Sequence, residues 1–125
     1  MKLVLGAHIP ITGGLETAIT RSEELGLSAF QIFTRSPRGW VYSALSNKEI
    51  IQFKSMKDDK FISVNSHMPY LTNFASPNDE VYKKSIESLK EELRRAHLLE
   101  LNHIVLHVGS HLGRGIDFGK LRVAS

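Results

Sequence analysis

Three histidines each stand just past a short apolar run, and they are the residues of this chain best suited to chemistry: His8, His67 and His107. Neutral imidazole is a common metal ligand and also a general base near pH 7. One histidine in such a place is usually structural. Three at equivalent strand ends converge on one mouth, because the carboxyl ends of parallel strands share an edge of the sheet. The pattern therefore favours a functional face there.

His67 and His107 form the best pair of metal ligands. They follow consecutive strands, which are usually neighbours in a sheet. Neighbouring strand ends lie about 5 Å apart, so two imidazoles could share one ion. Spacing alone leaves a structural alternative open for each residue, a turn residue at His67 and a strand-end hydrogen bond at His107.

The remaining histidines carry weaker signals. His111 follows His107 by four residues, but a Gly-Ser pair lies between them, so the helical HExxH arrangement does not apply. His8 and His111 are expected to line the mouth. His97, late in a helix, and His103, at the start of a strand, are expected to be structural. No catalytic residue can be assigned, because only Asp117, among the carboxylates, could stand near a strand end.

A basic and aromatic rim is expected beside this mouth. Arg35, Arg38 and Trp40 share one loop, and Tyr70 and Asn73 share the next. Arginine pairs with phosphate, and an aromatic ring can stack on a base or wedge beside it. The pattern therefore suggests nucleic-acid binding. An ordinary solvated loop with the tryptophan packed on a helix remains the alternative.

The elements that position these residues alternate between strands and helices. The expected strands are residues 3–7, 29–33, 61–65 and 104–106. A first helix runs from Leu15 to a stop at Gly26, and the capping-box spacing of Ser46 and Glu49 predicts a second. Ser76 before a proline predicts the start of a third. Its apolar stripe is Tyr82, Ile86, Leu89, Leu93 and Ala96. Residues 108–125 predict no definite element.

This order predicts an α/β fold, a single domain over residues 1–125 with a parallel βαβαβαβ arrangement. A doubly wound sheet and part of a (β/α) barrel both fit, but no GxGxxG or GxxxxGK[ST] motif supports mononucleotide binding. The absence of cysteine excludes disulfides and thiolate metal sites, and the net charge is +3. No apolar run could span a bilayer, so a cytoplasmic protein without a membrane partner is expected.

Four motifs together resemble the endonuclease IV family of metal-dependent apurinic/apyrimidinic endonucleases. Their order and separations fit over nearly the whole chain. They are Gly6-Ala7-His8 with Gly13-Gly14-Leu15, Phe33-Thr34-Arg35 with Arg38-Gly39-Trp40, His67 with Pro69-Tyr70-Leu71-Thr72-Asn73, and His107-Val108-Gly109-Ser110-His111-Leu112.

The resemblance implies a TIM-type barrel with up to three zinc ions at its mouth, and DNA cleavage on the 5′ side of an abasic site. His67 and His107 match two ligands of one zinc. Tyr70 matches an aromatic residue that intrudes into double-stranded DNA at the lesion, and Arg38 matches a basic residue of the DNA-facing loop. Arg35 is expected to add a phosphate contact.

The chain departs from the family pattern at Val108, where proline is usual, and in length. It supplies about four of eight strands, so it is interpreted as the first half of a TIM-type barrel that holds at most about one zinc. Self-association through exposed strand edges is then expected. Two other functions stay open, a metal-dependent sugar isomerase or epimerase on the related barrel, and an inactive half-barrel that binds DNA.

Overall fold

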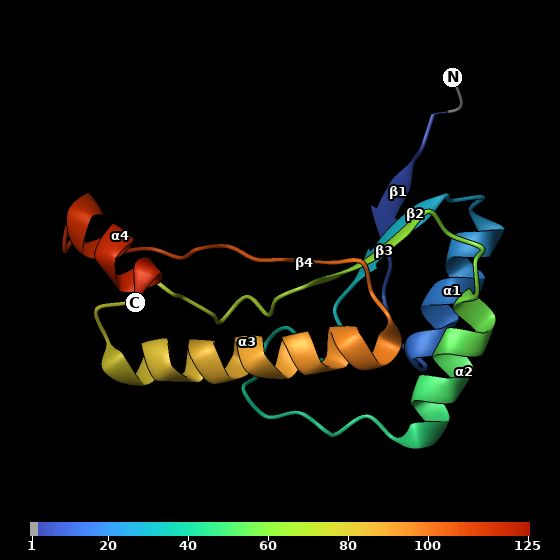
Figure 1. The fold of residues 1–125 in the computed structure, drawn as a ribbon, viewed down its shortest axis with the longest axis horizontal. Coiled ribbons are helices and arrows are strands. Elements are labelled where there is room, and N and C mark those ends of the chain that lie inside the picture. The colour runs from blue at the N-terminus through green and yellow to red at the C-terminus, as the bar shows by residue number, and fades with distance from the viewer. Residues whose placement is uncertain (1–2) are drawn as a thin grey trace.

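The computed structural model describes residues 3–125, in which strands and helices alternate (Figure 1). The strands are β1 (Gly6–His8), β2 (Ala29–Ile32), β3 (Ser63–His67) and β4 (His103–Val105). The helices are α1 (Leu15–Glu24), α2 (Asn47–Lys57), α3 (Asp79–Leu99) and α4 (Ile116–Ala124).

The four strands form one parallel sheet in the order β1-β2-β3-β4. Each strand therefore pairs with its neighbour in sequence, and all four carboxyl ends meet at one edge. This confirms the expected parallel βαβαβαβ arrangement. A parallel sheet in sequential strand order is the geometry of one half of a (β/α) barrel.

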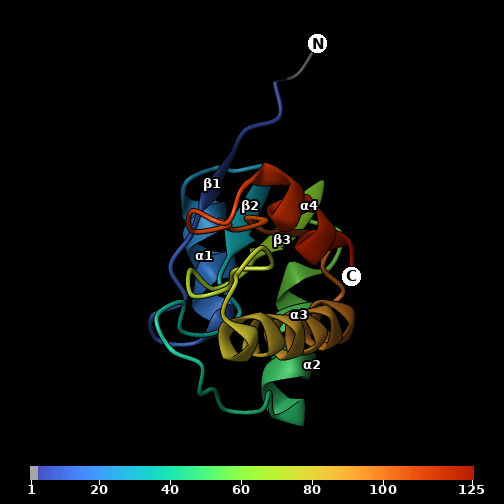
Figure 2. The same cartoon turned by 90° about the vertical axis from the view of Figure 1, so that its left-hand side faces the viewer.

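One face of the sheet packs on the helices. Phe30, Ile32 and Val64 are buried there, whereas Gln31 and Asn65, which point the other way, are only half-buried. Figure 1 shows α1 and α2 side by side at one end of the molecule, with α3 running beneath the segments that follow the sheet. Figure 2 shows α4 above α3. Arg122 of α4 pairs with Asp79 of α3, and its guanidinium lies 3.9 Å from the centroid of the Tyr82 ring. No helix among residues 3–125 is long and apolar enough to cross a membrane.

The helix starts agree with the sequence in two cases, α1 at Leu15 and α2, and differ in two. Ser46 and Glu49 form the expected capping box at α2, and Phe53 is fully buried. Helix α3, however, begins after Asn78, whose side-chain oxygen accepts from two backbone amides of the first turn, so the assignment of the cap to Ser76 is wrong. Helix α4, which the sequence did not predict, begins after a glycine instead of a side-chain cap.

The buried face of α3 also differs from the expected apolar stripe. Leu93, a member of that stripe, is 54% exposed, whereas Glu92 and Arg95 are buried. The reason is that α3 packs against polar groups of the segment after β2. A prediction from hydropathy alone puts Glu92 and Arg95 on the solvent face of the helix, because charged side chains are rarely buried unless they are paired.

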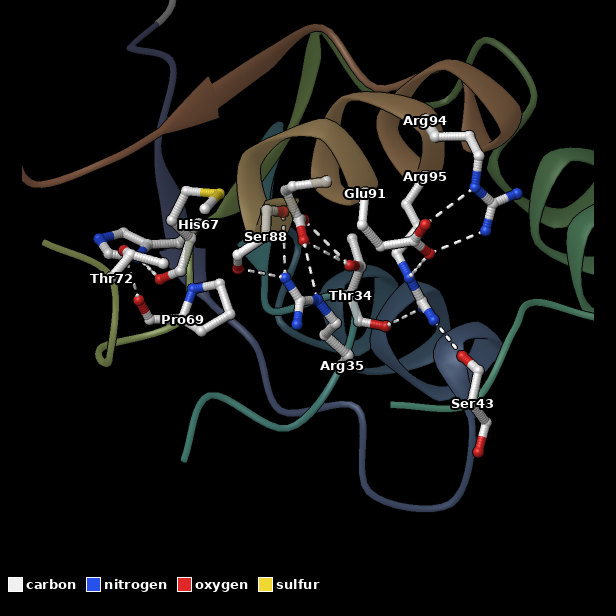
Figure 3. A network of polar contacts seen from close by, with 12 residues as sticks. Thr34, Arg35, Ser43, His67, Pro69, Thr72, Ser88, Glu91, Arg94 and Arg95 are labelled. Carbon is white, nitrogen blue, oxygen red and sulfur yellow. Dashed lines mark hydrogen bonds and ion pairs between the residues drawn. The ribbon is translucent and has the colours of Figure 1, made fainter. Parts of the chain in front are cut away.

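Glu92 is the centre of this polar packing, and Figure 3 shows its partners Thr34 and Arg35. The Thr34 hydroxyl lies 2.9 and 3.0 Å from its two carboxylate oxygens, and Arg35 Nε lies 3.5 Å from one of them. Burial raises the pKa of Glu92, while the Thr34 hydrogen bond and the charges of Arg35 and Arg95 oppose that rise. Arg35 also donates to the Ser88 hydroxyl over 2.6 Å.

These contacts correct the expectation for Arg35. Its side chain is 4% exposed and lies between Glu92 of α3 and the ring of Tyr42, 4.5 Å from the ring centroid. Arg95 donates to the Thr34 carbonyl over 3.0 Å and lies 5.3 Å from the same ring. Arg35 therefore holds α3 against the loop after β2, and its burial argues against a phosphate contact.

Two further contacts fix the loops that follow the strands. The Tyr70 amide donates to the Pro37 carbonyl over 3.1 Å, which joins the loops after β2 and β3. Asn73 exchanges two hydrogen bonds of 2.9 Å with the Ser110 backbone, which joins the loops after β3 and β4. Gly109 has φ +100° there, and a Cβ atom at this position would stand 2.0 Å from Asn73 Oδ1.

The two arginines of the loop after β2 should therefore differ in their effect on stability. Arg35→Met should lower the free energy of unfolding by about 3 kcal/mol, because it removes the ion-pair partner of the buried Glu92 carboxylate. Arg38→Met should change it by less than about 0.5 kcal/mol, since Arg38 is exposed. Urea unfolding followed by circular dichroism measures both. Equal losses would contradict the role given to Arg35.

Gly109 and Gly113 offer a matched pair for the loop after β4. Both have positive φ, but a Cβ atom at Gly113 would meet nothing within 4 Å. Gly113→Ala should cost about 1 kcal/mol of unfolding free energy from backbone strain alone. Gly109→Ala should cost roughly 3 kcal/mol, because it also displaces Asn73 from its hydrogen bonds. The measurement is the same urea titration, and similar costs would show that the Asn73 contact does not hold this loop.

Candidate functional site

Phe33 is the centre of a ring cluster at the carboxyl edge of the sheet. Its ring centroid lies 4.5 Å from that of His8, 5.5 Å from His67 and 5.1 Å from Tyr70. The His67 and His107 centroids are 5.1 Å apart. The structure thus brings together the three histidines of the strand ends and the aromatic residue of the predicted rim.

The parallel register explains why these side chains meet. His8 is the last residue of β1 and pairs with Gln31, and His67 is the last residue of β3 and pairs with Val105. His107 follows β4 by two residues, so it reaches the same edge as His67. The third strand is shifted from the predicted 61–65 to Ser63–His67, which makes His67 part of the ladder.

The spacing of His67 and His107 fits a shared metal ion. Zn–N bonds of about 2 Å at a roughly tetrahedral angle place the centroids of two ligating imidazoles roughly 5 Å apart. The observed distance is 5.1 Å. Both rings are accessible, since His67 is half-buried and His107 is exposed.

A backbone contact fixes the tautomer of His67. Its Nδ1 lies 2.7 Å from the Met68 carbonyl oxygen, which can only accept, so Nδ1 carries the proton. The lone pair is then on Nε2, and this is the arrangement in which metal-ligating histidines are usually held. Met68 is itself buried, and its amide donates to the Val105 carbonyl over 2.8 Å. The imidazole of His67 is therefore oriented by the sheet.

Two imidazoles do not complete a zinc site. Zinc sites normally use three or four protein ligands. Across residues 3–125, no three His, Cys, Asp or Glu side chains are grouped so that they could hold an ion. The donor set of His67 and His107 fits part of a metal centre whose other ligands come from elsewhere.

His8 differs from His67 in its environment. Gln31 Nε2 lies 2.9 Å from His8 Nδ1. Burial lowers the pKa of His8, and the charge of His67 lowers it further. A histidine with a lowered pKa is neutral at physiological pH, so the His8 side chain adds no positive charge to the mouth.

Tyr70 and Arg38 lie on the accessible side of the ring cluster. Tyr70 is 64% exposed although its ring contacts Phe33, and Arg38 is exposed on the neighbouring loop. A cavity of about 740 Å³ adjoins Tyr70, and its lining includes Asn73 and His107. An aromatic ring beside a cavity of this size, with an exposed guanidinium on the neighbouring loop, can contact a large polyanionic ligand.

Four other predicted residues lie outside this cluster. Arg35 is buried under α3, as described above. His111 is half-buried against α4, where its Nδ1 accepts from the Gly115 amide over 3.1 Å. Trp40 is half-buried near Lys84 of α3, which is the packed alternative considered for it. His103 contacts Asn65 over 3.1 Å, in keeping with a structural role.

The sequence did not single out two residues that organise the site. In the sequence, Phe33 is one apolar residue among others of a predicted strand, and Gln31 is a polar residue within the same apolar run. Alternation provides a usable signal for both, because residues 31 and 33 must face away from the buried Phe30 and Ile32. That places them on the same side as the histidines.

Comparison with known proteins agrees with this geometry. Residues 19–124 match the family described as xylose isomerase-like TIM barrel. Among curated relatives, probable endonuclease 4 of Halothermothrix orenii is 41% identical over 120 residues, which are 95% of this chain and 43% of the relative. Probable endonuclease 4 of Cenarchaeum symbiosum is 43% identical over 118 residues, 92% of this chain and 42% of the relative.

The crystal structure of endonuclease IV from Thermus thermophilus superimposes with a TM-score of 0.79 at 34% identity. The match covers 94% of this chain and 45% of that protein. The chain thus spans less than half the length of the relatives it matches. It belongs to the xylose isomerase-like TIM barrel family, and within that family it corresponds to the N-terminal half of endonuclease IV.

Proposed function

We propose that this chain is the N-terminal half-barrel of a DNA-repair endonuclease of the endonuclease IV type. The complete enzyme would hydrolyse the phosphodiester on the 5′ side of an abasic site in double-stranded DNA. The observation that carries this proposal is the His67–His107 pair, 5.1 Å apart, beside the exposed Tyr70. The names of the relatives give the same reaction class.

We propose zinc as the metal, with His67 and His107 as two of its ligands. Bound zinc would supply an activated hydroxide and stabilise charge on the phosphate. In this chain, His67 has a lone pair on Nε2, because its Nδ1–H group donates a hydrogen bond to the Met68 carbonyl oxygen. His107 is placed by the loop that Asn73 ties through Ser110. A full complement of up to three ions requires ligands beyond these residues.

Tyr70 and Arg38 are proposed to contact the DNA. The Arg38 guanidinium would pair with a phosphate of the DNA backbone. Such a contact increases affinity without sequence preference. The Tyr70 ring packs on Phe33, at a centroid distance of 5.1 Å, and Tyr70 is 64% exposed. A rigidly supported ring of this kind can wedge into a base step, and an abasic site lowers the unstacking cost.

Exposed apolar residues at the sheet edges support a proposal of self-association for this chain alone. Leu5, in the segment before β1, is 58% exposed, and Val105 on β4 is 40% exposed. Parallel sheets are normally closed or covered, so unpaired edges favour association. Metal and DNA binding are therefore best measured on a fraction of defined size.

Zinc binding should depend on the histidine pair. The purified chain should take up about one zinc ion weakly, and either His67→Ala or His107→Ala should lower the affinity at least about tenfold, because each removes one of only two protein ligands. His103→Ala is the matched control and should retain wild-type affinity. Competition with a fluorescent chelator gives the affinities, and elemental analysis gives the stoichiometry. Retention of zinc by the His67→Ala, His107→Ala double variant would refute the assignment.

DNA binding should separate the roles of Arg38 and Tyr70. Arg38→Ala should weaken binding equally to a duplex with one abasic analogue and to an intact duplex, and should lower the salt-dependence slope by about 0.9. Tyr70→Ala should instead reduce the preference for the abasic duplex. Fluorescence anisotropy at several salt concentrations measures both effects. A sugar isomerase or epimerase, the alternative function, would bind neither duplex.

A further inference from the structure

Two histidines at the same mouth are held through opposite hydrogen bonds. His67 Nδ1 faces the carbonyl oxygen of Met68, which has no proton to give. His8 Nδ1 faces the amide nitrogen of Gln31, which has no lone pair to offer. The first contact puts the proton on Nδ1 and leaves a lone pair on Nε2. The second puts the lone pair on Nδ1 and leaves a proton on Nε2.

The sheet itself sets the contact between His8 and Gln31. The two residues are register partners on β1 and β2, so their side chains stand side by side on the same face. That face is open, and a cavity of about 250 Å³ there is lined by residues that include His8, Gln31 and Asn65. His8 is exposed, so its Nε2 is accessible to a ligand.

We propose that His8 is a fixed hydrogen-bond donor to an oxygen of the phosphate group bound at this mouth, and that Gln31 is the positioning residue that selects its tautomer. The proposal rests on the proposed function, which places a phosphate beside His67 and His107. A neutral N–H group bonds strongly to an anionic oxygen. It also avoids the repulsion that an imidazolium would suffer next to a metal dication.

The same contact disfavours zinc binding through Nε2 of His8. The lone pair of its neutral ring is on Nδ1, where it accepts from the Gln31 amide. A metal at Nε2 would require the proton to move to Nδ1, against that amide. The three histidines of the strand ends therefore divide into two ligands and one donor.

A second amide–histidine contact provides the control. Asn65 is the register partner of both Gln31 and His103, and its Oδ1 lies 3.1 Å from His103 Nδ1. The amide oxygen can only accept, so His103 carries its proton on Nδ1, opposite to His8. Gln31→Glu and Asn65→Asp thus make the same chemical change in the same row of the sheet, next to different histidines.

Nitrogen-15 NMR of the histidine rings in the metal-free chain tests the tautomers. At about pH 8, where free histidine is neutral, His8 should carry its proton on Nε2, and His67 and His103 should carry theirs on Nδ1. Gln31→Glu should move the His8 proton to Nδ1, because a carboxylate accepts. Asn65→Asp should leave His8 unchanged. A proton on Nδ1 of His8 in the wild-type chain overturns the proposal.

Phosphate titration of the zinc-loaded chain tests the donor role, with inorganic phosphate as the probe. His8→Phe should raise the Kd for phosphate about tenfold, which is the effect of one hydrogen bond to an anion, and should leave zinc affinity unchanged. His8→Asn, which restores an N–H donor, should recover part of the loss. An unchanged Kd for phosphate in His8→Phe, or a loss of zinc, overturns the donor role.

Different measurements would refute the proposed function and the proposed tautomer of His8. A wild-type chain that takes up no zinc would overturn the proposed function, and with it the phosphate contact of His8. The tautomer assigned through Gln31 is read in the metal-free chain, so it is decided by the NMR result alone.

Discussion

The register of the four parallel strands is the constraint on which the site depends. In β3, Ser66 is fully buried against the helices while His67 faces the open side. A slip of one residue would exchange the two and turn the imidazole into the core. The register is fixed because Phe30, Ile32 and Val64 must all reach the helices. The burial of three apolar side chains thus determines where the histidine side chains stand.

A second set of contacts fixes the loops that follow the strands at the carboxyl edge of the sheet. The loop after β2 is held from below by Glu92 and Arg95 of α3, and it is joined to the next loop through the Tyr70 amide. A buried carboxylate needs compensating partners, and here a hydroxyl and arginine provide them. Polar contacts of this kind are directional, so they fix loop positions that apolar packing leaves adjustable. This explains why charged residues occupy the buried face of a helix whose apolar residue Leu93 is exposed.

The sequence predicted the fold class and the histidine cluster, because both follow from local patterns. Apolar runs marked β2 and β4 to within one residue, whereas β1 and β3 begin three and two residues later than predicted. The histidines after the runs marked the carboxyl edge of the sheet. It failed for Arg35, since the partner that buries this residue, Glu92, lies 57 positions later in the chain. It also failed for α4, whose first turn follows Gly115 without a side-chain cap, and for the start of α3, where Ser76 and Asn78 are both good caps. Long-range pairing, and competition between equivalent local signals, are what one sequence cannot resolve.

The different tautomers of His67 and His8 follow from the groups that their Nδ1 atoms contact. An imidazole next to a carbonyl keeps a lone pair for a metal, and one next to an amide nitrogen keeps a proton for an oxygen. His67 and His8 meet these two conditions although they contact the same Phe33 ring. A phosphodiester needs both kinds of group, since its oxygens can bind a cation and accept a proton-bearing donor at once. The proposed ligand pair and the proposed donor would therefore form one side of a phosphate site, and a third metal ligand would come from outside this cluster.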